Sequence, residues 1–179
     1  MQERGITLSE MLEARDRRSE RQRLWLSGAP DAALLVLTVI MPGSVKRDAY
    51  SLTAAREALK ALTRRLGKDI LKVEEFDLPT GFEAFMLVSL PAVRVKRIAC
   101  EIEDTHPLGR LFDIDVINKD MTPLGRASLD IAPRRCMLCD NDARVCMRSR
   151  AHSYDELIKH IHSLIDSYKS DSYKATGNA

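Results

Sequence analysis

Two aspartates in the sequence Leu111-Phe112-Asp113-Ile114-Asp115-Val116 have the types and spacing that point most directly to chemistry. The stretch has the composition of a β-strand, in which successive side chains point to opposite faces. Asp113 and Asp115 are therefore expected on one face and the apolar residues on the other. Neighbouring carboxylates repel unless a cation lies between them, and Mg²⁺ takes one or two carboxylates together with phosphate oxygens. The pair predicts a Mg²⁺ site for phosphoryl or nucleotidyl transfer; the alternative is an exposed strand face that happens to carry two acids.

The sequence just before this strand is also acidic. Glu101, Glu103 and Asp104 fall at the end of the preceding predicted helix, and Gly109-Arg110 comes directly before the strand. A glycine permits close approach of the backbone, and an arginine can hold a phosphate. This segment is therefore expected to contribute to the same site.

A basic segment complements the acidic one. Between Arg134 and Arg150 there are five arginines and two aspartates, with Arg134 and Arg135 adjacent and Arg148 close to the end. A protein that handles a metal–polyphosphate needs carboxylates for the metal and arginines for the phosphates. The two segments together fit that requirement.

The same basic segment contains Cys136-x2-Cys139, followed by Cys146 and His152. Three thiols and one imidazole make a Cys₃His set, which is a structural zinc composition. If zinc binds, it is expected to be structural, because the protein fills all four positions. The alternative is three reduced thiols, partly buried in a short helical hairpin.

Two further residues are weaker candidates. Lys46 follows a Pro-Gly turn and is either a phosphate ligand or a solvated loop lysine. His106 precedes a proline and is either a proton carrier or a helix cap.

The elements that must position these residues follow from hydrophobic periodicity. A Thr-x-x-Glu capping box at Thr7 opens a helix that runs to about Trp25. The later pattern predicts strands at 33–40, 70–76, 84–90 and 111–117, with helices at 51–66, from Pro91 to the His106-Pro107 stop, and at 153–168. The order from 33 to 117 is β-α-β-β-α-β, so the predicted fold is α+β, with a ferredoxin-like split βαβ antiparallel sheet and two helices on one face.

The remaining segments are assigned around that sheet. The N-terminal helix and the C-terminal region are available to cover its other face. The middle of the first helix, residues 15–23, is almost wholly polar, which indicates either a solvated face or a surface for phosphate or an acidic partner. We expect one domain over residues 1–169, with its core sheet at 33–117 and a Cys/Arg-rich segment at 133–152, and a flexible tail at 170–179.

Composition limits the class of protein. The chain has 179 residues, 28 Lys and Arg against 26 Asp and Glu, a net charge of +2 and 45% hydrophobic residues. The balance of charge argues against coating of nucleic acid, which needs a positive field. The sequence shows no secretory segment, no bilayer-length apolar run and no secreted disulfide pattern. A cytoplasmic protein without a membrane or nucleic-acid partner is expected.

Taken together, these motifs resemble the apo-citrate lyase phosphoribosyl-dephospho-CoA transferase family. The resemblance rests on the following stretches: Arg15-Asp16-x-Arg18, Pro42-Gly43 with Lys46, Gly81-x-Glu83, Lys96 with Glu101 and Glu103, His106 to Val116, Pro133 to Cys139, and Cys146-x-Arg148 with His152. It covers nearly the whole chain except the tail. Phe82 departs from the proline expected between Gly81 and Glu83.

The resemblance implies a nucleotidyltransferase-type reaction. The phosphoribosyl-dephospho-CoA part of 2'-(5''-triphosphoribosyl)-3'-dephospho-CoA is attached to a serine of the citrate lyase acyl carrier protein, its gamma subunit, and diphosphate leaves. A related carrier, such as that of malonate decarboxylase, is a less favoured acceptor. The rival interpretation is a non-catalytic, zinc-stabilised, Arg-rich module that binds nucleic acid or an acidic protein.

The implied roles of the residues are as follows. Asp113 and Asp115 hold Mg²⁺, and Glu101 or Glu103 is a further ligand or the base for the serine. The substrate-binding candidates are Arg110, Arg134, Arg135, Arg148, Lys46 and His106. Arg15 and Arg18 of the first helix contact either the acidic carrier or the ligand.

Overall fold

The computed structural model describes residues 4–29 and 31–176. Its helices and strands, in chain order, are α1 (Leu8–Ser27), β1 (Ala33–Val39), α2 (Ala49–Leu66), β2 (Ile70–Leu78), β3 (Gly81–Val88), α3 (Ala92–Thr105), β4 (Phe112–Ile117), α4 (Ala143–Ser149) and α5 (Tyr154–Thr176). Short 3₁₀ turns lie at Gly67–Asp69, Gly109–Leu111 and Ala127–Leu129. The predicted α+β class is confirmed.

The four strands form one antiparallel sheet in the order β2-β3-β1-β4. β1 is central, and its residue Leu37 lies opposite Ala84 of β3 on one side and Ile114 of β4 on the other. The continuous apolar run of β1 is buried on both faces, as its sequence predicts. β4 is an edge strand, so its outer backbone groups need partners from elsewhere.

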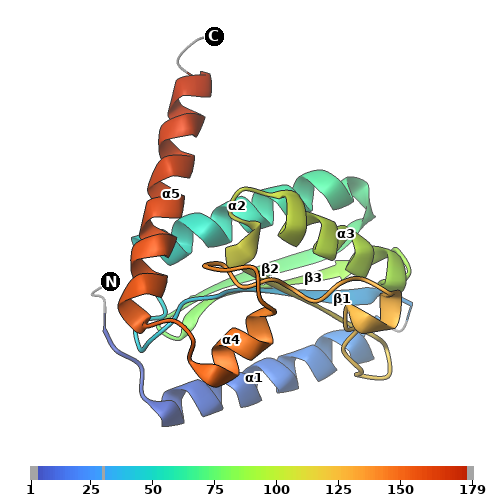
Figure 1. The fold of residues 1–179 in the computed structure, drawn as a ribbon. Coiled ribbons are helices and arrows are strands. Elements are labelled where there is room, and N and C mark those ends of the chain that lie inside the picture. The colour runs from blue at the N-terminus through green and yellow to red at the C-terminus, as the bar shows by residue number, and fades with distance from the viewer. Residues whose placement is uncertain (1–3, 30, 177–179) are drawn as a thin grey trace.

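Both faces of the sheet are covered by helices (Figure 1). α2 and α3 pack on one face, where Leu62 and Ala99 join alternate strand residues in the larger core cluster. α1 lies across the opposite face and contributes only Trp25 and Leu26, near its C-terminal end, to the smaller core cluster. Ala14 is the other buried residue of α1, and it belongs to neither cluster, so the middle of the helix adds little to the apolar core.

The ends of α1 and α5 show what sequence reasoning resolved and what it missed. Thr7 and Glu10 form the predicted capping box at the start of α1. The C-terminal helix packs Ile161 and Ile165 beside α2, so it does not cover the second sheet face. It also continues through residues 170–176, where the sequence predicted a flexible tail, because that stretch contains no glycine or proline to end a helix. Residues 177–179 of that predicted tail lie outside the described residues.

Among the helices of the described residues, none is both long enough and apolar enough to cross a membrane.

Candidate functional site

Asp113 and Asp115 lie on the side of β4 that faces α1. The predicted alternation is confirmed, since Phe112, Ile114 and Val116 are buried against α2 and α3. Asp113 is half-exposed and lies opposite Thr38 of β1, whose hydroxyl donates a hydrogen bond of 3.3 Å to Asp113 Oδ2.

The second carboxylate of the pair, Asp115, has no partner in the described part of the chain that compensates its charge. Asp115 is exposed, and no described residue hydrogen-bonds to it or forms an ion pair with it. Surrounding protein removes part of its hydration and Asp113 adds a like charge, and these two effects raise the pKa of Asp115. Water still reaches the carboxylate, so its desolvation is partial. A bound cation would offset both effects.

A buried acid on β3 extends this polar layer across the sheet. Glu83 is 2% exposed and receives two hydrogen bonds from Arg18 of α1, of 3.0 Å from Nε and 2.8 Å from Nη2. Arg21 approaches the other oxygen of Glu83 at 3.6 Å and stacks over the Phe76 ring at 3.8 Å. The middle of α1 is thus attached to the sheet through charges, on the face that carries the aspartate pair.

Sequence reasoning did not select Glu83 or Arg21 as site residues. The available signal was a lone acid within the otherwise apolar strand Gly81–Val88, where an unpaired charge is costly to bury.

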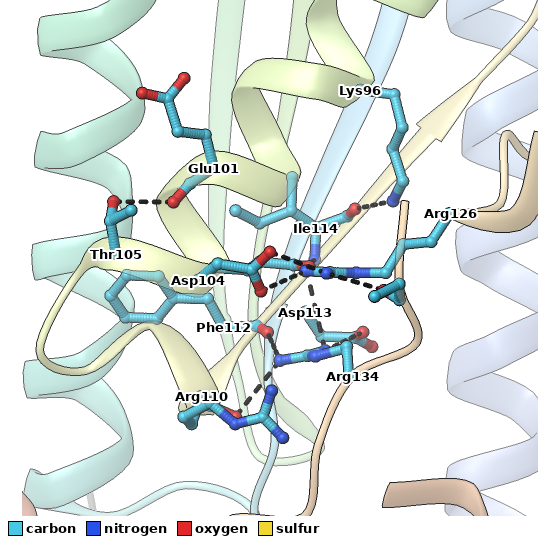
Figure 2. Close-up of polar contacts among 12 residues, drawn as sticks. Lys96, Glu101, Asp104, Thr105, Arg110, Phe112, Asp113, Ile114, Arg126 and Arg134 are labelled. Atoms are coloured by element: carbon cyan, nitrogen blue, oxygen red, sulfur yellow. Dashed lines mark hydrogen bonds and ion pairs between the residues drawn. The ribbon is translucent and has the colours of Figure 1, made fainter. Parts of the chain in front are cut away.

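The outer edge of β4 is closed by side chains instead of another strand (Figure 2). Arg134 donates to the carbonyl oxygen of Phe112 at 2.6 Å, and Lys96 donates to that of Ile114 at 2.7 Å. Glu103 Oε1 accepts the N–H of Ile114 at 3.0 Å. These contacts satisfy backbone groups that an edge strand would leave open.

Arg134 also links this edge to the aspartate pair. Its Nη1 lies 3.4 Å from Asp113 Oδ1 and 3.9 Å from Glu103 Oε1. Its Nη2 donates a second hydrogen bond, of 3.2 Å, to the carbonyl of Arg110. The structure therefore brings four predicted residues into one network: Arg134, Asp113, Glu103 and Arg110.

Arg126 is a further member that sequence reasoning missed. Its guanidinium contacts Glu103 Oε2 at 2.8 Å and both carboxylate oxygens of Asp104, at 2.8 and 2.9 Å. Burial alone would lower the pKa of Arg126, but the hydrogen bonds that it donates to these two carboxylates raise it. No local pattern reveals this contact, because its acidic partners lie more than twenty residues earlier in the chain.

A pocket of ≈ 380 Å³ opens beside this network. Its lining residues come from three segments: Asp104, Arg110, Arg126, Ala132, Pro133, Arg135, Cys136, Met137, Cys139 and Asp140. Burial and the nearby charge of Arg134 lower the pKa of Arg110, and Asp104 partly offsets them. We call the pocket the arginine pocket; its three arginines suit an anion such as phosphate.

Several predicted residues lie away from the aspartate pair. Glu101 forms a two-point ion pair with Arg65, which lowers the pKa of Glu101, and Figure 2 shows it pointing away from Asp113. Lys46 donates to the carbonyl of Met41, and burial lowers the pKa of its ammonium group. Neither side chain contacts the network at β4.

Three more predicted residues, His106, Arg15 and Arg148, lie at a helix cap or on the surface. His106 caps α3, accepts the N–H of Leu108 at Nδ1 and packs against the Phe112 ring, and burial lowers its pKa. Arg15 of α1 and Arg148 of α4 are exposed.

The predicted Cys₃His set is brought together. The donor atoms of Cys136, Cys139, Cys146 and His152 all lie within 4.8 Å of one another. Cys139 Sγ lies 3.5 Å from Cys146 Sγ and 3.3 Å from His152 Nε2. This cluster is able to bind a metal such as zinc.

The fold and site define an α+β protein in which a carboxylate pair and an arginine pocket flank one edge strand, an arrangement suited to phosphate chemistry. The sequence profile of a family described as "Apo-citrate lyase phosphoribosyl-dephospho-CoA transferase" matches residues 6–168. Proteins of that name from Escherichia coli (strain SMS-3-5 / SECEC) and Shigella boydii serotype 18 (strain CDC 3083-94 / BS512) are each 33% identical over 165 residues, covering 90% of both chains. The chain belongs to this family and is a transferase.

Proposed function

We propose that this transferase moves the phosphoribosyl-dephospho-CoA group of 2'-(5''-triphosphoribosyl)-3'-dephospho-CoA to a serine of the apo citrate lyase acyl carrier protein. The serine oxygen bonds to the innermost phosphorus of the triphosphate. The bond from that phosphorus to the next phosphate breaks, diphosphate leaves with the electron pair, and the serine proton is released. In a chain of this family, the observation that carries the proposal is the pair Asp113 and Asp115, of which Asp115 has no partner among the described residues, placed beside the arginine pocket.

We infer that Asp113 and Asp115 hold a Mg²⁺ ion during the reaction. The residues fit the ion, because both offer hard carboxylate oxygens on one face of β4, and Asp115 has no protein partner among the described residues. When bound, Mg²⁺ supplies positive charge that balances the triphosphate and the departing diphosphate.

The arginine pocket is proposed to bind the phosphates. Arg110 and Arg135, which the sequence already suggested, are the candidates for this role, whereas the guanidinium of Arg126 is held by Glu103 and Asp104 at the pocket wall. Fixed cations at a developing negative charge are worth about 3 kcal/mol of barrier each. Arg134 and Glu103 are proposed as positioning residues, because their polar groups are occupied by β4, Asp113 and Arg126.

The acidic carrier is proposed to meet exposed arginines of α1 and α4. Arg15 and Arg148 are free to face solvent, whereas Arg18 is held by Glu83. Complementary charge mainly speeds association, so weakening of this contact by salt is expected. The rival non-catalytic module lacks the support that membership of a transferase family gives to an enzyme.

Two broader assignments complete the proposal. We propose that the sheet has the ferredoxin-like split βαβ arrangement, which the strand order β2-β3-β1-β4 and the two helices on one face support. We also propose that the enzyme acts in the cytoplasm, which its four free cysteines support.

The test is Mg²⁺-dependent release of diphosphate from triphosphoribosyl-dephospho-CoA in the presence of the apo carrier. Wild type is compared with Asp113→Asn, Asp115→Asn and the control Glu75→Gln, which alters an exposed acid on β2. Release by wild type and Glu75→Gln, with loss of at least 100-fold in both aspartate variants, is the expected result. Full release without divalent cation, or by Asp113→Asn, would contradict the metal site.

A further inference from the structure

We propose that Cys136, Cys139, Cys146 and His152 bind one structural Zn²⁺ ion, and that this ion holds the segment 134–152 in the position where Arg134 closes the edge of β4. The metal assignment does not depend on the proposed transfer reaction, because it rests on the ligand geometry alone.

The separations of the donor atoms match a tetrahedral centre. Zn–S bonds of about 2.3 Å place two sulfurs about 3.8 Å apart, and the shorter Zn–N bond gives a slightly smaller S···N separation. The observed Cys139 Sγ–Cys146 Sγ and Cys139 Sγ–His152 Nε2 distances are 3.5 and 3.3 Å. The N–H of Leu138 points to Cys136 Sγ at 3.5 Å and would stabilise a thiolate there.

The chemistry of the donors selects the metal and its role. Three thiolates and one imidazole in a tetrahedron favour zinc over Mg²⁺ or Ca²⁺, which prefer oxygen. Four protein donors leave no open position for water or substrate, so the ion is structural. A disulfide is not formed, since the 3.5 Å sulfur separation far exceeds a bond of about 2.05 Å.

The surrounding segment has little apolar packing apart from Met137, which lies against the larger core cluster, so a metal centre would add to its stability. α4 has seven residues, of which Cys146 alone is buried, while Val145 and Met147 are exposed. A helix of this length is unstable on its own. Two backbone hydrogen bonds, from Cys136 N to Asn141 O at 2.7 Å and from Ala143 N to Arg134 O at 2.9 Å, tie the segment only to itself.

The zinc ligands and Arg134, which helps to close the edge of β4, are near one another in the chain. Arg134 lies two residues before the first zinc ligand, and its guanidinium contacts the carbonyls of Arg110 and Phe112. Cys136 and Cys139 also line the arginine pocket. Loss of the ion is therefore expected to release Arg134 from β4 and Arg135 from the pocket wall.

The experiment measures metal content of the full chain, purified without added chelator, by inductively coupled plasma mass spectrometry. One zinc per chain is expected in wild type and in the control Cys100→Ala, which removes a buried thiol of α3 outside the cluster. Cys139→Ser and Cys146→Ser are expected to retain less than 0.2 zinc per chain. Absence of zinc from wild type, equal zinc in wild type and Cys139→Ser, or a Cys139–Cys146 disulfide in freshly purified protein would each overturn the proposal.

A second measurement guards against variants that do not fold. Wild-type protein stripped of metal and titrated with Co²⁺ is expected to show thiolate-to-cobalt absorption and the strong visible bands of a tetrahedral ion, saturating at one equivalent. Trypsin is expected to cleave the stripped protein at least tenfold faster after Arg144 and Arg148, while the circular dichroism of the sheet is retained. Octahedral cobalt bands, or unchanged cleavage on metal removal, would overturn the assignment or its positioning role, respectively.

Discussion

Replacing Glu103 with glutamine tests whether this residue supports β4, as its contacts indicate. Its matched control is Glu101→Gln, because the two glutamates lie two positions apart on α3 and differ mainly in their surroundings. Glu103 is 3% exposed and contacts Ile114 and Arg126, whereas Glu101 forms a surface pair with Arg65.

The magnitude follows from the contacts that are lost. In Glu103→Gln the amide oxygen still accepts the Ile114 N–H, but the charge-assisted bond to Arg126 is lost, which costs about 1.5–3 kcal/mol of unfolding free energy. Glu103→Ala also leaves the buried Ile114 N–H without an acceptor, which adds about 1–3 kcal/mol. For a domain of this size, the Glu103→Gln loss corresponds to about 3–12 °C in Tm.

The assay is thermal and urea unfolding followed by circular dichroism, together with kcat of transfer measured at a temperature where all variants are folded. We expect Glu103→Gln to lower Tm as stated, Glu103→Ala to lower it further, and Glu101→Gln to leave it near wild type. Equal effects of the two glutamine substitutions would refute the reasoning. So would an unchanged Tm in Glu103→Gln with loss of all transfer, which would assign the residue to the chemistry.

Three further outcomes are expected. The pKa of Asp115 is raised in the folded state, so the stability that its protonated form contributes is present below the unfolded pKa and is lost as pH rises through the folded pKa. In Mg²⁺-free buffer, Asp115→Asn should therefore raise Tm above about pH 4, where the wild-type carboxylate becomes charged. A decrease in Tm that does not depend on pH would contradict this. A Cβ at Gly109 would lie 2.5 Å from a backbone carbonyl oxygen of α3, whereas a Cβ at Gly125 would have nothing within 4 Å. Gly109→Ala should therefore lower the free energy of unfolding in urea by about 1–3 kcal/mol, and Gly125→Ala should change it very little. Similar urea midpoints for the two variants would count against the close approach at Gly109. Glu83→Gln and Arg18→Lys should each reduce kcat/KM at least tenfold, because Glu83→Gln removes the charge that pairs with Arg18 and Arg21, and a lysine cannot reproduce the two hydrogen bonds that Arg18 donates to Glu83 Oε1. Unchanged kinetics in both variants would remove α1 from the site.

The sequence predicted those features that depend on local periodicity. Alternation along β4 placed Asp113 and Asp115 correctly, and the continuous apolar run identified β1 as a strand buried on both faces. The spacing of Cys136, Cys139, Cys146 and His152 indicated a cluster that the structure assembles. Each of these signals lies within one segment of the chain.

Features that depend on contacts between distant segments were not predicted. Residues two apart on a helix point in nearly opposite directions, so the shared acidity of Glu101 and Glu103 concealed different environments. The polar middle of α1 resembled a solvated surface, because its pairing with Glu83 joins residues 65 positions apart in the sequence. Gly109 was interpreted as an approach point for a ligand, but the close approach is to the carbonyls of Ile102 and Glu103.

The intact mass of purified apo citrate lyase acyl carrier protein, after incubation with this chain, Mg²⁺ and triphosphoribosyl-dephospho-CoA, tests the central claim most directly. The account predicts one mass increment equal to the phosphoribosyl-dephospho-CoA group, located on a serine, and its loss when Asp113→Asn replaces the wild-type chain. An unmodified carrier, under conditions in which the Escherichia coli relative modifies it, would contradict the proposed function.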